Sequence, residues 1–135
     1  MPDETTERDR LNLLSHRVIG AALRVHKEIG PGMLEKACET CLEFELRDQG
    51  VAVERQVALP LFYRGHRMEC GYRVDLLVEK ELIVEIKSVE RIERVHRARL
   101  RHYLIHSKLK LGLLINFNVQ WLRDGVKRVV NGLPE

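Results

Sequence analysis

Aromatic residues are scarce in this chain, and several other features are absent. Phe, Trp and Tyr make up 5% of the 135 residues, which argues against a platform of aromatic side chains on which bases stack. No apolar run approaches the length of a membrane span, and the charged N-terminus "MPDETTERDR" lacks the apolar core of a signal peptide. Three cysteines, an odd number, do not form a disulfide framework. We therefore expect a cytoplasmic protein.

The composition is that of an ordinary globular domain, with 44% hydrophobic and 32% charged residues. The length predicts a single domain over residues 1–135, in which residues 1–7 form a flexible leader. The net charge of +3 is too small to indicate a nucleic-acid partner by itself. The distribution of charge along the chain must decide that question.

Apolar periodicity divides the chain into a helical part and a strand-rich part. Helical spacing predicts two helices, over 8–29 and 33–49, with "GPG" between them as a helix breaker. The period then changes to two, which predicts strands and one more helix. These later elements are strands over 51–63, 68–78 and 82–89, a helix over 92–107, a strand over 109–117 and a terminal hairpin around "RDG". The strand-helix-strand crossover around residues 82–117 favours a parallel pair of strands. The predicted fold class is therefore α/β, with a mixed β-sheet flanked by α-helices.

The stretch "VDLLVEKELIVEIK" places Asp75, Glu85 and Lys87 inside an apolar hairpin. A turn centred on Lys80 pairs position i with position 160 minus i, which sets Asp75 opposite Glu85. Opposed side chains on antiparallel strands lie roughly 5 Å apart and face the same way. Two carboxylates at this separation repel each other, unless one is protonated or a cation lies between them.

Two interpretations of these three residues remain open. A divalent cation would relieve the repulsion, and Mg²⁺ prefers one or two carboxylates together with water and substrate phosphates. Lys87 shares a strand face with Glu85, from which it can orient a water for attack on phosphorus. Alternatively, Lys87 forms a plain ion pair with Asp75 or Glu85 that holds the register of the hairpin.

Positive charge is concentrated directly after this hairpin. Seven Arg or Lys residues stand against two Glu residues between Glu90 and Lys110. This excess predicts contact with nucleic-acid phosphates, by backbone and shape and without sequence specificity. The alternative is a solvated helix face. The residues nominated for nucleic-acid contact are Arg94, Arg97, Arg99, Arg101 and Tyr103.

Other potential ligands have simpler explanations. "CETC" has the spacing of half a zinc site, but no second such pair exists, so Cys38 and Cys41 are expected to be small buried residues. His26 precedes the "GPG" turn and is a weak site candidate, since a histidine there often caps a helix. Tyr63, Tyr72 and Trp121 are expected to be packing residues.

The hairpin motif "VD" followed by "EIK" resembles the active-site signature of the PD-(D/E)XK nuclease superfamily. The stretch "VHKEIGPGMLEKAC" resembles the GxxExxY family, a branch of that superfamily, and the likeness continues through "ERQV", "YRVDLLVE", "VEIKSV" and "LGLLINFN". The resemblance implies a restriction-endonuclease-like core. It also implies Asp75, Glu85 and Glu35 as ligands of Mg²⁺ or Mn²⁺, and Lys87 as the catalytic lysine.

The chain departs from these families at two positions. Cys38 replaces the final Tyr of GxxExxY, and Arg99 stands where related nucleases often have a glutamine four residues before a tyrosine, here Tyr103. Glu35 also has a simpler explanation, because a carboxylate in the first turn of a helix is favourable against the helix dipole.

The sequence thus predicts a metal-dependent nuclease that hydrolyses DNA or RNA. The alternative is a catalytically inactive module with a nuclease-like fold that binds nucleic acid or assembles with itself. A homo-oligomer is expected in either case to enlarge the binding surface. A third reading treats the charged trio as a structural ion-pair network.

Overall fold

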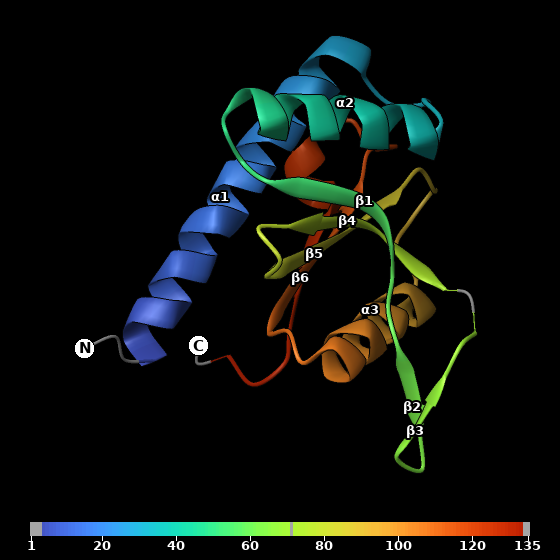
Figure 1. The fold of residues 1–135 in the computed structure, drawn as a ribbon. Coiled ribbons are helices and arrows are strands. Elements are labelled where there is room, and N and C mark those ends of the chain that lie inside the picture. Colours follow the sequence, from blue (N-terminus) through green and yellow to red (C-terminus); the bar gives the residue numbers. More distant parts are fainter. Residues whose placement is uncertain (1–3, 71, 134–135) are drawn as a thin grey trace.

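The computed structural model describes residues 4–70 and 72–133 (Figure 1). Within these ranges, five strands form one mixed sheet in the order β1-β4-β5-β6-β7. Only β5 and β6 run parallel, and α3 connects them, as the crossover predicted. The strands of the sheet are β1 (Val53–Ala58), β4 (Arg73–Val78), β5 (Leu82–Lys87), β6 (Leu111–Asn116) and β7 (Val126–Val130).

Helices cover both faces of the sheet, which confirms the predicted fold class (Figure 1). Helices α1 (Glu4–Ile29) and α2 (Glu35–Asp48) pack on one face, and α3 (Arg94–Ser107) packs on the other. The larger core, beneath α1 and α2, includes Val18, Leu42, Leu46, Leu76, Val84, Ile86, Leu113 and Phe117. The smaller core, beneath α3, contains Val74, Ile83, Leu100, Tyr103, Leu104 and Leu114. None of the helices in the described ranges combines the length and apolar character needed to cross a membrane.

The first helix starts earlier than the sequence predicted. It begins at Glu4, so residues 4–7, expected in a flexible leader, are helical, while residues 1–3 lie outside the described ranges. The carboxylate of Glu7 accepts a hydrogen bond from Lys110 Nζ at 2.9 Å. This contact joins the first turns of α1 to the start of β6.

The predicted strand over 51–63 is wrong, because it is two strands. Strand β1 ends at Ala58, and β2 (Leu61–Tyr63) pairs instead with β3 (His66–Met68) in a hairpin separate from the main sheet. Pro60 lacks the N–H that a continuous central strand needs. Arg64 and Gly65 both have positive φ, as a tight two-residue hairpin turn requires. The expected strand over 68–78 is likewise divided between β3 and β4.

The predicted terminal hairpin is also wrong. Residues 122–125 form a 3₁₀ turn, η1 (Leu122–Gly125), and β7 pairs antiparallel with β6 rather than with the segment before the turn. A Cβ atom on Gly125 would collide with the carbonyl oxygen of Asn116. This close approach brings the chain back onto the edge of β6.

Candidate active site

The register predicted for the hairpin of β4 and β5 is confirmed where the two strands pair. Leu76, Leu77 and Val78 face Val84, Ile83 and Leu82, respectively. The turn is made at Glu79 and Lys80, which both have positive φ. Strand pairing stops beyond Leu76 and Val84, and the site begins there.

Asp75 and Glu85 continue the connection between the strands through their side chains. The Asp75 backbone N–H donates to Glu85 Oε1 at 3.1 Å, and the Ile86 N–H donates to Asp75 Oδ2 at 2.8 Å. Each carboxylate thus accepts a backbone hydrogen bond from the opposite strand. The sequence prediction that the two carboxylates meet across the hairpin agrees with this arrangement.

The strand is irregular at Asp75, which explains why a carboxylate fits there. Val74 packs beneath α3, whereas Leu76 packs beneath α1 and α2, although residues two apart in a regular strand share a face. On the neighbouring strand, Gln56 occupies the register position opposite Asp75 and has φ of 51°. A non-glycine residue in this conformation is uncommon and often marks a functional site.

Burial and mutual repulsion disfavour the charged forms of this pair. Desolvation, followed by the charge of Asp75, raises the pKa of Glu85 to about 8. Desolvation also raises the pKa of Asp75, against the opposing effect of the Ile86 N–H hydrogen bond. At neutral pH, Glu85 therefore holds a proton in the cation-free protein. A divalent cation between the carboxylates would displace that proton.

Lys87 ends β5 half-buried, and its side chain makes no hydrogen bond or ion pair within residues 4–70 and 72–133. Its positive charge lowers the pKa values of Glu85 and Asp75, though less than burial raises them. The ion-pair interpretation of the trio requires direct contact between Lys87 and a carboxylate. Among the described residues this contact is absent, which leaves the ammonium group available to a ligand.

Glu35 lies at the start of α2, close to the end of β5. Its Oε2 accepts a hydrogen bond from the Ser88 N–H at 3.0 Å, and Ser88 Oγ donates to the Met33 carbonyl at 2.7 Å. Glu35 and Asp75 line the same pocket, of about 360 Å³. The fold therefore brings Glu35 to the site. One of its carboxylate oxygens is hydrogen-bonded to Ser88, the residue that follows the strand of Glu85 and Lys87.

Three residues beside this pocket were not nominated from the sequence. Glu39 is buried, and its Oε2 accepts hydrogen bonds from Arg55 Nε at 3.1 Å and Nη2 at 2.8 Å. Gln56 Nε2 donates to Glu39 Oε1 at 2.8 Å and to Asp75 Oδ1 at 3.3 Å. This chain of contacts orients Asp75 from α2 through β1. The spacing of Glu35 and Glu39, one helical turn apart, was the available sequence signal.

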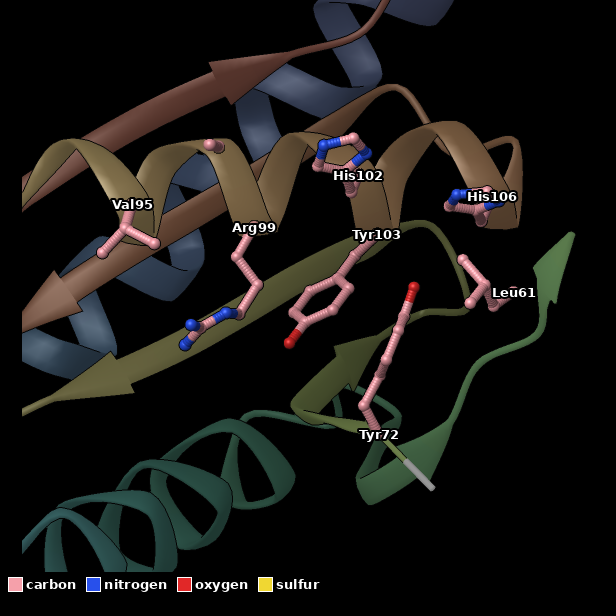
Figure 2. Close-up of a pocket in the computed structure, with 8 residues that line it drawn as sticks. Leu61, Tyr72, Val95, Arg99, His102, Tyr103 and His106 are labelled. Carbon is pink, nitrogen blue, oxygen red and sulfur yellow. The ribbon is translucent and has the colours of Figure 1, made fainter. Parts of the chain in front are cut away.

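The arginines of α3 lie on different sides of the helix and do not form one continuous surface. Helical periodicity places Arg94, Arg97 and Arg101 along one stripe, and Arg101 Nη1 donates to the Val130 carbonyl at 3.1 Å. Arg99 projects from another side of α3, next to Tyr103 (Figure 2). Tyr103 is buried; desolvation, followed by the charge of Glu85, raises its pKa to about 12. Of the residues nominated on α3, Tyr103 is thus close enough to Glu85 to feel its charge, and Arg99 lies beside Tyr103.

His26 contacts the segment that follows β6. Its Nε2 is 2.7 Å from the carbonyl oxygen of Val119, and its ring lies 6.4 Å from that of Phe117.

The predictions of buried packing residues are confirmed only in part. Cys38 belongs to the core beneath α1 and α2, as expected for a small buried residue, whereas Cys41 is only half-buried. Tyr63 and Trp121 are exposed, so the prediction that they are packing residues is wrong.

The donors present suit a cation that retains water. Among the described residues, no group of three or more His, Cys, Asp or Glu side chains is arranged to hold a metal ion. The carboxylate pair, with its raised pKa values, instead offers the one or two acidic ligands that Mg²⁺ or Mn²⁺ needs when water and phosphate complete the shell. The residues therefore fit a divalent cation that retains bound water, which a phosphate oxygen of the substrate can later replace.

Comparison with known proteins gives one family match. The model of the PD-(D/E)XK nuclease superfamily matches residues 12–129, which include all the strands of the main sheet except the last residue of β7. No curated protein and no solved structure matches the chain.

Proposed function

The chain belongs to the PD-(D/E)XK nuclease superfamily, and we propose that it is a metal-dependent nuclease that hydrolyses phosphodiester bonds of DNA or RNA. Nucleic acid is the substrate class that the superfamily implies. We assign the chain to the GxxExxY branch on the basis of Gly32 and Glu35, whose carboxylate reaches the end of β5. Cys38 in place of the final Tyr lies in the core, away from solvent.

The principal support is the contact of buried Glu85 with half-buried Asp75, beside a lysine that has no ion-pair partner in the described ranges. A structural role alone would be better served by apolar residues or by a closed ion pair. A strongly raised pKa such as that of Glu85 is typical of functional sites.

Asp75 and Glu85 would hold Mg²⁺ or Mn²⁺, and Glu35 would contribute on the α2 side of the pocket. Such a cation, when bound, activates water and neutralises charge on phosphate. Gln56 and the Ile86 N–H keep Asp75 in the orientation needed to act as a ligand. Lys87 positions the attacking water and stabilises the negative charge that develops on the phosphate oxygens. Arg99 contacts a phosphate next to the scissile one.

Cleavage is expected to require a divalent cation. The test incubates the purified protein with end-labelled single-stranded and double-stranded DNA and RNA, in Mn²⁺ or in EDTA, with Asp75→Asn prepared in parallel to detect contaminating nucleases. We expect at least one substrate to be cut by the wild type in Mn²⁺ and none in EDTA. Cleavage that persists in EDTA, or that is equal in the Asp75→Asn preparation, would contradict the proposal.

A second candidate function is an inactive module that binds nucleic acid or assembles with itself. It is favoured by the two departures from the family pattern, Cys38 in place of the final Tyr of GxxExxY and Arg99 in place of a glutamine. The same assay separates the two functions. An inactive module binds nucleic acid equally well in Mn²⁺ and in EDTA, and cuts it in neither.

A further inference from the structure

A second pocket lies on the α3 side of the sheet, and Arg99 is the one residue of its lining that also has a role in the proposed hydrolysis. It has a volume of about 650 Å³ and lies between α3 and the segment that leads through the hairpin of β2 and β3 into β4 (Figure 2). Arg99, His102, Tyr103 and His106 line it from α3, and Leu61 and Tyr72 line it from the opposite side. The Phe62 N–H donates to His106 Nδ1 at 3.3 Å, which fixes the hairpin to the end of α3.

Flat side chains form much of the pocket wall. The rings of Tyr72 and Tyr103 have centroids 4.7 Å apart and are tilted by 42°. The rings of His102 and His106 are stacked, with centroids 6.3 Å apart and an angle of 20° between them. The low aromatic content of the chain argued against a stacking surface, yet the fold gathers two of its seven aromatic residues and two of its six histidines here. Such walls suit a planar ligand.

Tyr72 offers its ring to the pocket rather than its hydroxyl. The hydroxyl oxygen is buried, and Figure 2 shows it directed toward α3. A ligand in the pocket can therefore contact the ring of Tyr72, which suits a stacked planar group.

The pocket adjoins the carboxylate site. Tyr103 lines the pocket and belongs to the same core cluster as Val74, the residue before Asp75. Tyr72 precedes β4, the strand that carries Asp75. Arg99 provides positive charge at the same wall, and Figure 2 shows its side chain and that of Tyr103 both extending from α3 toward the strands. A nucleic-acid strand that has one phosphate at Asp75 and Glu85 can therefore place a neighbouring base in the pocket.

We propose that this pocket binds one unpaired nucleobase of the substrate, stacked against Tyr72 and His102, while Arg99 contacts the adjoining phosphate. This inference rests on the proposed nuclease function and narrows its substrate to single-stranded nucleic acid or to a strand with an unpaired nucleotide. Because every base presents a flat face, stacking here does not require sequence specificity.

The test compares two fluorescein-labelled strands of equal length and charge, oligothymidylate and the same backbone with abasic residues throughout. Binding is measured by fluorescence anisotropy in EDTA, where no cleavage is expected. Phosphate contacts are the same for both strands, so the ratio of their dissociation constants reports the bases alone. We expect the wild type to bind the base-bearing strand about tenfold more tightly, in line with base–aromatic stacking.

Pocket variants are expected to reduce this ratio. Tyr72→Ala and His102→Ala should bring it to about one or two, whereas Tyr72→Phe, which keeps the ring, should leave it near the wild-type value. His102 is exposed, so its variant is expected to fold even if Tyr72→Ala does not. His16→Ala, an exposed histidine on α1, is the matched control and should keep the wild-type ratio.

Two results would overturn the base-binding inference: a wild-type ratio near one, or a ratio that Tyr72→Ala and His102→Ala leave unchanged. Cleavage in Mn²⁺ by the same preparations keeps the two proposals separate. A ratio near one with active cleavage rejects the pocket and retains the nuclease. A ratio that the pocket variants abolish, without cleavage in Mn²⁺, supports base binding and rejects the nuclease.

Discussion

Replacement of Lys87 by alanine is expected to lower kcat/KM for strand cleavage by about 100- to 1,000-fold, the usual effect of removing one group that stabilises transition-state charge. The Lys87 ammonium group has no ion-pair partner in the described part of the chain, so its loss breaks no structural contact. The folded state should therefore survive. The measurement is the initial rate of cleavage of an end-labelled strand in Mn²⁺, together with the thermal midpoint of each protein.

Two controls give this result its meaning. Lys80→Ala removes an exposed lysine from the turn of the same hairpin and should cleave at the wild-type rate. Lys87→Ala should still bind Mn²⁺, because the lysine is not one of the proposed ligands of the cation. A Lys87→Ala protein that cleaves at the wild-type rate, or that loses activity only by unfolding, would remove Lys87 from the mechanism.

Glu85→Gln is expected to stabilise the cation-free protein strongly at alkaline pH. The pKa of Glu85 is raised to about 8 in the folded state, first by burial and then by Asp75, against 4.5 for an ordinary glutamate. The folded protein therefore binds more protons than the unfolded chain between these values, so its free energy of unfolding falls as pH rises through this window. The full loss is on the order of 5 kcal/mol, since each pKa unit corresponds to about 1.4 kcal/mol.

Glutamine cannot ionise, yet its side-chain oxygen can still accept the hydrogen bond from the Asp75 N–H. Urea unfolding in EDTA at pH 5 and at pH 9 should show wild-type stability falling by several kcal/mol, and Glu85→Gln losing far less. Glu90→Gln, at an exposed position after β5, should follow the wild type. Equal pH dependence in wild type and Glu85→Gln would show that Glu85 does not titrate in this window.

Local periodicity in the sequence predicted the part of the candidate site that lies on the hairpin of β4 and β5. A three-residue turn centred on Lys80 and strict alternation fixed the register from Leu76 to Val78, which brought Asp75 and Glu85 together. The sequence also placed Lys87 on the same strand face as Glu85, but it left open whether the lysine forms an ion pair with a carboxylate. The answer depends on the distance between the ammonium group and the carboxylates, which the tertiary structure determines.

The features that sequence reasoning missed depend on contacts between distant segments. Gln56 adopts a left-handed conformation only because β1, β4 and α2 meet around it. Pro60 diverts the chain out of the sheet, which forms the hairpin that closes the pocket beneath α3. Tyr72 and Tyr103 come from segments far apart in the chain, so neither apolar periodicity nor motif spacing predicted their contact.

The most direct test of the metal site is calorimetric titration of Mn²⁺ into the chelator-treated protein at pH 7, in two buffers of different ionisation enthalpy. Because Glu85 has a pKa of about 8, cation binding should release close to one proton, and the observed heat should differ between the buffers accordingly. Asp75→Asn, which lacks one acidic ligand, should show no specific binding. Absence of Mn²⁺ binding by the wild type, or equal binding by Asp75→Asn, would contradict the assignment of this carboxylate pair as the metal site of a nuclease.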